Sequence, residues 1–182
     1  MLKTSEILDE KDKRLRLVSE EVTFPLAKED KDLINKMIKY LHDSQIEKLA
    51  KKYDLRPGMG MAAIQLGVAK RYLTIVHEVG EEEFDTYVIC NPKIISNSEE
   101  KIYVDMGEGC LSVNRDVKGI VPRYARVTVE GYDTEGNKIR IRAREELAIA
   151  FQHEIDHLNG ILFIDHIDKK NPYKDQDKYR AI

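Results

Sequence analysis

The sequence predicts an α+β protein with mostly antiparallel sheets packed around one buried helix and a further helix near the N-terminus. Apolar residues recur at helical spacing between residues 31 and 53 and again between residues 145 and 159. Most of the chain between these segments consists of short runs with strand composition. Because these runs follow one another directly, the βαβ alternation of a parallel sheet is missing.

Length and charge limit the classes of protein to which this chain can belong. At 182 residues the chain fits one domain, so we expect a single catalytic unit spanning residues 1–182. Its 30 lysines and arginines against 33 acidic residues leave a net charge of −3, which predicts no direct nucleic-acid binding. With no signal peptide and no apolar run of about 18 residues, we expect no membrane association and a cytoplasmic location.

The N-terminal third is predicted to form an arm followed by a helix. Residues 1–28 mix charge with short apolar pieces, and Pro25 disfavours helix at Phe24, so we expect an extended arm or loop over the body. The following helix is amphipathic, and the polar residues Asp43 and Ser44 predict a break or kink there. Its apolar positions are Ile34, Met37, Ile38, Leu41, Ile46, Leu49, Ala50 and Tyr53.

The centre of the chain is predicted to form strands, and a helix follows them. Strand-like runs cover residues 71–79, 86–95, 101–106, 125–133 and 138–143. The last two should form a hairpin with Gly136 at the turn. The helix then extends from residue 144 or 145 to residue 159, with acidic residues at its start and Gly160 as a stop signal. Residues 160–167 alternate like a strand that leaves this helix.

The late helix carries two histidines around a glutamate. His153 and His157 lie one turn apart, with Cβ atoms about 6 Å from each other, so both imidazoles can reach one metal ion beside Glu154. Such short patterns also occur by chance on exposed helices. The apolar residues 147–151 predict a buried helix, however, and buried imidazoles and carboxylates are costly unless a metal and its water compensate them.

A third metal ligand is harder to find. One large group of zinc peptidases has a histidine where this chain has Phe163, which cannot bind a metal. A second group uses a later glutamate, and no glutamate follows Glu154. His166 remains a candidate, although its place in the alternating segment favours an ordinary surface or hydrogen-bonding role.

The two cysteines differ in their surroundings. Cys90 lies in an apolar strand-like run and is expected to be a small buried hydrophobic residue. Cys110 follows Gly107 and Gly109, whose freedom at positive φ would let the backbone bend closely around a site. Three protein ligands that include Cys110 would leave a position for water, which is the arrangement of a catalytic metal site.

Three motifs together resemble the signature motifs of the peptide deformylases in order and spacing. They are GMGMAAIQ at residues 58–65, EGCLS at residues 108–112 and HEIDH at residues 153–157. EGCLSV and the long segment between the first two motifs resemble the branch often called type 2, common in Gram-positive bacteria. The resemblance covers the chain from about Gly58 to Ile167.

This resemblance implies an activity, a cofactor and partners. The family removes the formyl group from the N-terminal formyl-methionine of newly made polypeptides, by attack of water that a metal and a glutamate activate. Fe(II) is the usual metal, and Zn(II), Ni(II) or Co(II) can occupy the site. The partners implied are N-formyl-methionyl nascent peptides and, transiently, the ribosome.

The resemblance also implies a role for each matching residue. The metal ligands are Cys110, His153 and His157, the acid/base residue is Glu154, and the oxyanion is held by Gln65 and the backbone N–H of Leu111. An extended peptide would bind along Gly58, Met59, Gly60 and Gly109, and Ile149 and Ala150 would line the methionine pocket. Apart from the resemblance, the charges of Glu108 and Arg123 predict an ion pair that steadies the cysteine loop, with an ordinary surface ion pair of little energetic value as the alternative.

Two other functions compete with this interpretation. The first is an endopeptidase, which shares the metal chemistry, and the second is a metal- or peptide-binding module without turnover. The presence of both Glu154 and Gln65 argues against the binding module, because that function needs neither a base nor an oxyanion donor.

Overall fold

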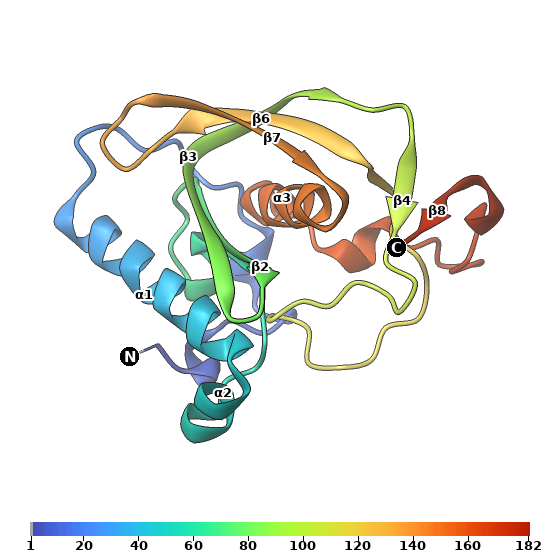
Figure 1. Ribbon diagram of the computed structural model, residues 1–182, viewed down its shortest axis with the longest axis horizontal. Helices are drawn as coiled ribbons and strands as arrows, with labels where there is room; N and C mark the ends of the chain where they lie inside the picture. The colour runs from blue at the N-terminus through green and yellow to red at the C-terminus, as the bar shows by residue number, and fades with distance from the viewer. Residues whose placement is uncertain (1) are drawn as a thin grey trace.

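The computed structural model describes residues 2–182. At its centre lies the helix α3 (Glu145–Leu158), which the strands β6 and β7 cover along one side and β2 and β3 flank on another (Figure 1). A second, smaller sheet with β4 and β8 lies at the opposite end of the molecule from α1. The α+β class with mostly antiparallel sheets is confirmed. No helix among residues 2–182 combines the length and apolar character that crossing a membrane requires.

The N-terminal helix is interrupted later than the sequence predicted. α1 covers Lys28–Gln45 and α2 covers Glu47–Tyr53, with extended backbone at Ile46 between them. Asp43 and Ser44 stay helical because α1 itself satisfies their side chains. The Asp43 carboxylate accepts from Lys39 Nζ at 2.7 Å, and Ser44 Oγ donates to the carbonyl of Leu41 at 2.9 Å.

The larger sheet has five strands in the order β1-β2-β3-β6-β7, and every neighbouring pair is antiparallel. The strands are β1 (Gly60–Ala62), β2 (Tyr72–Gly80), β3 (Glu83–Asn97), β6 (Arg126–Tyr132) and β7 (Lys138–Arg144). The predicted hairpin is confirmed, with Gly136 at a φ of 87° in its turn. Register shifts between Cys90 and Lys93 and between Ile94 and Ser96 interrupt the long strand β3, which bends around α3 in Figure 1.

The smaller sheet joins distant parts of the chain. It has the order β5-β4-β8, with β4 at Lys101–Tyr103, β5 at Arg123–Tyr124 and β8 at Arg180–Ala181. The strand predicted over residues 101–106 therefore ends at Tyr103. The long loop between β4 and β5 carries Cys110, so this sheet fixes both ends of the cysteine loop.

The strand predicted over residues 160–167 is wrong. Residues Phe163–His166 form a 3-10 helix, and a second short one lies at Gln176–Lys178. The Asp165 carboxylate accepts from Leu162 N at 2.8 Å, and Asp165 N donates to the Leu162 carbonyl at 2.9 Å, which closes the turn. Leu162 and Phe163 are consecutive and both buried, which a half-buried strand would not allow.

The N-terminal arm covers the C-terminal end of α3. The sequence predicted an extended arm or loop here. The arm is extended apart from two 3-10 turns, at Thr4–Glu6 and Lys13–Arg16. Ser19 N donates to the Leu158 carbonyl at 2.8 Å, which satisfies one of the free carbonyls at the helix end. Gly160 ends the helix with a φ of 73°, and a side chain there would lie 2.5 Å from the Arg16 carbonyl.

Candidate metal centre and active site

Cys110, His153 and His157 meet at one point. One ligand atom from each lies within 4.8 Å of the other two, and no other such group of three occurs among residues 2–182. Cys110 Sγ is 3.3 Å from His157 Nε2, and the two imidazole rings have centroids 5.0 Å apart. The histidines come from successive turns of α3 and the cysteine from the β4–β5 loop. Thiolate and imidazole donors suit Fe(II), Zn(II), Ni(II) and Co(II).

The cysteine loop is held by contacts around the sulfur. Ser112 N donates to Cys110 Sγ at 3.4 Å, and Gln65 Nε2 lies 3.7 Å from the same atom. Arg56 Nη2 donates to the Cys110 carbonyl at 2.8 Å from outside the loop. The Ser112 and Gln65 N–H groups fix the position of the sulfur, and Arg56 fixes the backbone of the loop.

The two glycines of this loop differ from the expectation. Gly107 has a φ of 85°, as the sequence predicted. Gly109 does not have a positive φ, and a side chain there would meet no atom within 4 Å. Only Gly107 therefore needs the conformational freedom of glycine for the bend.

A buried ion network lies behind the metal centre. Arg123 Nε and Nη2 bind the two oxygens of Glu108 at 2.7 and 3.0 Å, so the expected pair is present. Glu108 also accepts from His153 Nδ1 at 2.9 Å, and Arg123 Nη1 binds Asp156 at 2.6 Å. Burial alone would raise the pKa of Glu108, but His153 and Arg123 hold it at about 2. The carboxylate thereby occupies His153 Nδ1 and directs Nε2 to the metal centre.

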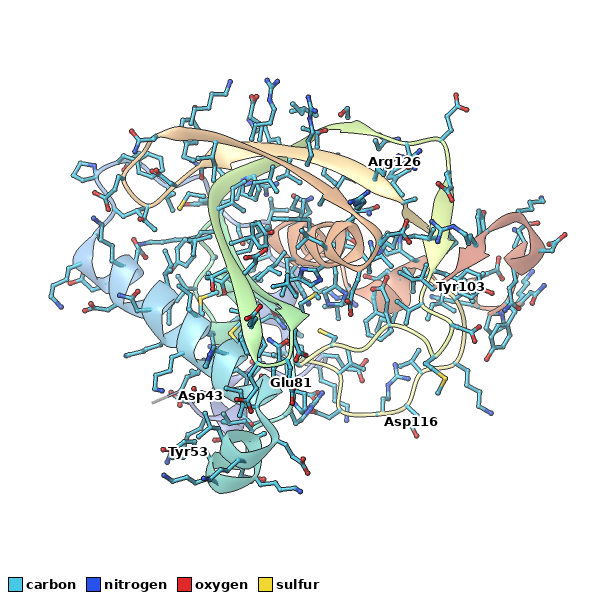
Figure 2. All side chains as sticks on the ribbon, in the orientation of Figure 1. Asp43, Tyr53, Glu81, Tyr103, Asp116 and Arg126 are labelled. Carbon is cyan, nitrogen blue, oxygen red and sulfur yellow. The ribbon has the colours of Figure 1, made fainter. Side chains whose placement is uncertain are left out.

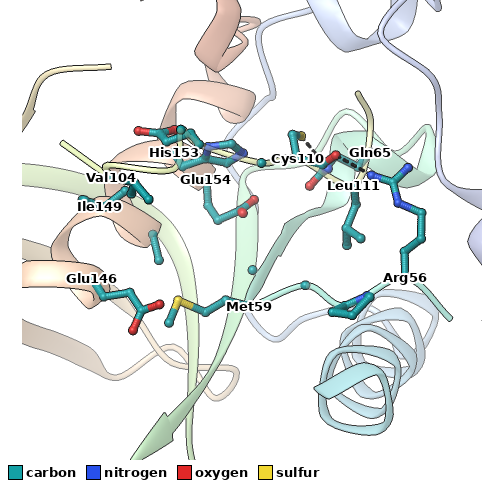
Figure 3. Close-up of a pocket in the computed structure, with 17 residues that line it drawn as sticks. Arg56, Met59, Gln65, Val104, Cys110, Leu111, Glu146, Ile149, His153 and Glu154 are labelled. Atoms are coloured by element: carbon teal, nitrogen blue, oxygen red, sulfur yellow. Dashed lines mark hydrogen bonds and ion pairs between the residues drawn. The ribbon is translucent and has the colours of Figure 1, made fainter. Parts of the chain in front are cut away.

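Glu154 is buried beside the cluster. Its side chain points into the pocket in Figure 3, and its Oε2 has no hydrogen-bond partner in the described part of the chain. Burial raises the pKa of this carboxyl to about 7. A β-carbon on Gly60 would lie 2.5 Å from Glu154 Oε1, so glycine is what allows β1 to approach so closely.

The three histidines in and near the cluster differ in their contacts. His157 Nδ1 is buried without a partner, and burial lowers the pKa of this imidazole well below its usual value, which favours the neutral ring that binds metals. Phe163 stacks on the His153 ring with centroids 6.0 Å apart. His166 lies outside the cluster, because its Nε2 binds the Asp156 carboxylate at 2.7 Å.

A cavity of about 350 Å³ opens onto the cluster (Figure 3). All the residues expected to bind substrate or the oxyanion line it, namely Gly58, Met59, Gly60, Gln65, Gly109, Leu111, Ile149 and Ala150. Several lining residues are apolar, including Val104, and an apolar lining suits an aliphatic side chain. One wall is β1, an edge strand that pairs only with β2.

Gln65 follows β1 directly, in the 3-10 helix Ala63–Leu66. Its Oε1 accepts from Ala62 N at 2.9 Å, and its Nε2 donates to Ser112 Oγ at 3.1 Å. These two bonds fix the amide so that its donor side faces Cys110. The site therefore has a rigid N–H donor, a buried carboxyl and a ligand cluster around one cavity.

Several residues of the site were missed at the sequence level. Arg56 and Glu146 line the cavity, Ser112 binds both Gln65 and Cys110, and Asp156 extends the ion network. No periodicity or motif marks Arg56 or Glu146. Ser112 lies in the EGCLS motif and Asp156 lies in the HEIDH motif. Membership of these motifs is the signal in the sequence that could have identified them.

In comparisons with known proteins, nearly the whole chain matches one family. The family described as Polypeptide deformylase matches residues 4–173. "Peptide deformylase 2" of Bacillus cereus is 45% identical over 182 residues, which cover 100% of this chain and 99% of the relative. "Peptide deformylase" of Macrococcus caseolyticus is 48% identical over 184 residues, with 100% of both chains covered.

Solved structures share the fold. A probable peptide deformylase from Synechococcus phage S-SSM7 superimposes with a TM-score of 0.73 at 35% identity, covering 88% of this chain and 98% of the other. The peptide deformylase of Ehrlichia chaffeensis gives a TM-score of 0.74 at 36% identity, covering 90% of this chain and 88% of the other.

Proposed function

The chain belongs to the polypeptide deformylase family, and we propose that it removes the formyl group from the N-terminal formyl-methionine of newly made polypeptides. As a peptide deformylase it is a metal-dependent hydrolase of protein biosynthesis. The observation that carries the specific proposal is the buried, unpartnered Glu154 Oε2 beside a Cys-His-His cluster and an apolar cavity.

Cys110, His153 and His157 would hold the metal, and the proposed ion is Fe(II), with Zn(II), Ni(II) or Co(II) as substitutes. The thiolate favours soft and borderline ions over Mg²⁺ or Ca²⁺. When bound, such an ion would polarise the formyl carbonyl and make a coordinated water more acidic. Glu108 would keep His153 in the tautomer that binds through Nε2.

Glu154 is proposed as the acid/base residue. A carboxyl with a pKa near 7 takes a proton from the attacking water and holds it at little free-energy cost. The same carboxyl then delivers this proton to the amine nitrogen that leaves the formyl carbon. Its buried position keeps the proton from exchanging with bulk solvent between the two steps.

Gln65 and the backbone N–H of Leu111 are proposed to stabilise the oxygen that becomes negative. Both residues line the cavity next to Cys110, and the Gln65 amide is already oriented by Ala62 and Ser112. Donors fixed in advance need no rearrangement during the reaction, and each is typically worth about 3–4 kcal/mol of barrier.

The peptide is proposed to bind as an added strand along β1. Gly58, Met59 and Gly60 offer backbone groups at an open sheet edge, and Gly109 lines the facing loop. Ile149 and Ala150, one turn before His153, would contact the methionine side chain. We further propose that the enzyme works in the cytoplasm, where nascent peptides become available, and contacts the ribosome transiently.

Activity on a formylated peptide tests the proposal. Anaerobically prepared, iron-loaded protein should hydrolyse formyl-Met-Ala-Ser and release formate, and should leave Ala-Met-Ala-Ser intact. Formate release coupled to a dehydrogenase measures the first reaction, and mass spectrometry measures both. Absence of formate from metal-loaded protein would contradict the function, and cleavage of the unformylated peptide would favour an endopeptidase.

Metal retention tests the ligand set. Cys110→Ala should lose most of the bound iron or zinc after gel filtration, because two imidazoles alone hold these ions weakly. Cys90→Ala is the matched control, since Cys90 is a buried thiol outside the cluster. Elemental analysis of both variants gives the metal-to-protein ratio. Equal loss in the two variants would contradict the choice of Cys110.

A further inference from the structure

The outer face of β6 and β7 carries cations that the proposed reaction does not use. In the strand register Arg126 lies opposite Arg144, and Thr128 lies opposite Arg142. Alternation along a strand places Arg142 and Arg144 on the same face, about 7 Å apart. All three arginines are exposed, and Figure 2 labels Arg126 at the end of the sheet that approaches β4.

A groove of about 420 Å³ lies on this face. We call it the arginine groove, and its lining residues include Arg126, Arg142, Arg144, Ser96, Ser98 and Thr128. Its apolar lining residues, Val127 and Ala143, are buried at 3% and 4% exposure, so the lining residues that reach solvent are polar residues and arginines.

Local acids neutralise only some of the positive charges on this face. Glu130 binds Lys138 and Arg140 at 2.7 and 2.8 Å, and Glu100 binds Arg126 at 3.2 Å. Arg142 and Arg144 form no ion pair with any of residues 2–182. The net charge of −3 for the whole chain therefore hides an uncompensated positive charge on one face.

Although the net charge of the whole chain predicted no direct nucleic-acid binding, we propose that the arginine groove binds the phosphate backbone of an RNA strand. Guanidinium groups bind phosphate oxygens in pairs, and two free ones at a strand spacing of about 7 Å meet successive charges of a regular polyanion. The hydroxyls of Ser96 and Thr128 form no hydrogen bond with residues 2–182, and hydroxyl groups are common donors to phosphate and sugar oxygens, whereas Ser98 Oγ already donates to the Glu100 carbonyl. A membrane surface fits less well, because stable association with anionic lipid also needs apolar side chains that insert, and those in the groove are buried.

Binding of a labelled 20-nucleotide poly(U) strand, followed by fluorescence anisotropy, tests this proposal. The affinity should fall as KCl rises from 50 to 200 mM, with a log–log slope of about −1.4 to −2.1 for two to three neutralised phosphates. Arg142→Gln/Arg144→Gln should reduce this slope by about 1.4 and weaken binding at 50 mM KCl at least tenfold.

Lys36→Gln/Lys48→Gln is the matched control. It removes the same charge from exposed positions on α1 and α2 that also lack an ion pair within residues 2–182, and it should change the affinity less than twofold. Formate release from a formyl-Met peptide should be unchanged in both double variants, which shows that they are folded. Arg142→Lys/Arg144→Lys should keep the salt slope but weaken binding, because it keeps charge and loses paired hydrogen bonds.

Three results would overturn the proposal. The first is no measurable binding of poly(U) by the wild-type protein at 50 mM KCl and 100 µM protein. The second is an equal loss of affinity in the arginine and lysine double variants. The third is tighter binding to polyglutamate or to phosphatidylserine vesicles than to RNA, which would assign the groove to an acidic protein or to a lipid surface.

Discussion

At the scale of single residues, the site keeps two buried polar atoms unsatisfied. Glu154 Oε2 and His157 Nδ1 have no partner among residues 2–182, although most buried polar atoms in proteins have one. Each such atom lowers the free energy of unfolding by about 1–3 kcal/mol. A metal, a water or a substrate would give Glu154 a partner, so this loss of stability is consistent with a site made for a ligand.

Glu154→Gln tests the role of the carboxyl. We expect kcat for formyl-Met-Ala-Ser to fall by about 10²–10⁴-fold, because the amide cannot take up or return a proton. The melting temperature should not fall, since the variant removes a buried carboxyl whose pKa is raised to about 7. Glu99→Gln, at an exposed position, should change neither quantity. A decrease in kcat of less than tenfold for Glu154→Gln would argue against Glu154 as the base.

Some site residues could be located from the sequence, and others could not. His153, Glu154 and His157 were placed together because helical spacing brings them onto one side of a helix. Cys110 was located by excluding other ligands and by its motif. Arg56 was missed because it acts on the backbone carbonyl of a residue 54 positions away, and no local pattern encodes such a contact.

At the scale of elements, the short strand β1 connects the sheet to the site. It has only three residues, pairs with β2 and leads directly into the turn that carries Gln65. Gly58 and Gly60 flank Met59, and side chains at these glycines would collide with Leu111 and Glu154. The glycines therefore set the distance between the sheet edge and the catalytic helix.

Gly60→Ala tests this close approach. The added methyl would lie 2.5 Å from Glu154 Oε1 and 2.8 Å from its Cγ, so the Glu154 side chain must move. A misplacement of about 1 Å can reduce the rate about 100-fold, and we expect kcat to fall at least tenfold. Gly80→Ala is the control, because Gly80 does not line the cavity and its methyl would meet the exposed Glu83 side chain at 3.1 Å, so kcat should change less than threefold. Similar kcat values for both variants would show that the contact with Glu154 does not matter.

The elements that the sequence predicted are the long and periodic ones. The α3 helix, the β6–β7 hairpin and strands β2 and β3 have enough residues to show their period. β1 and β8 have three and two residues, and their strand character comes from partners distant in the sequence. The segment 160–167 misled the prediction because its apolar alternation is produced by a 3-10 turn that Asp165 closes.

At the scale of the whole molecule, buried groups that ionise in alkali should limit stability. Burial raises the pKa of the Cys90 thiol from 9.0 to about 12, and burial also raises the pKa of Tyr72. Between pH 9 and pH 12 the unfolded chain loses the Cys90 proton while the folded protein keeps it. The contribution of this thiol to stability is therefore fully present below pH 9 and is lost as pH rises toward 12.

Urea unfolding under reducing conditions at several pH values checks this expectation. The free energy of unfolding should decline above pH 9, and Cys90→Ala should decline less steeply than the wild type. The difference in slope should stay below the roughly 1.4 kcal/mol per pH unit that one fully buried proton gives. The slopes are compared rather than the absolute values, because the variant also loses packing. Parallel curves would show that Cys90 does not govern the alkaline limit.

The buried network of Glu108, Arg123 and Asp156 also bears on how the sequence can change over generations. Replacement of Arg123 alone would leave the buried Glu108 and the half-buried Asp156 with only histidines as partners, at a cost of several kcal/mol. Replacement of Glu108 alone would leave the buried Arg123 with Asp156 as its one carboxylate partner among residues 2–182 and would release His153 Nδ1. Neither position can mutate first without loss of fitness, so related genes should show these residues inherited together or exchanged together.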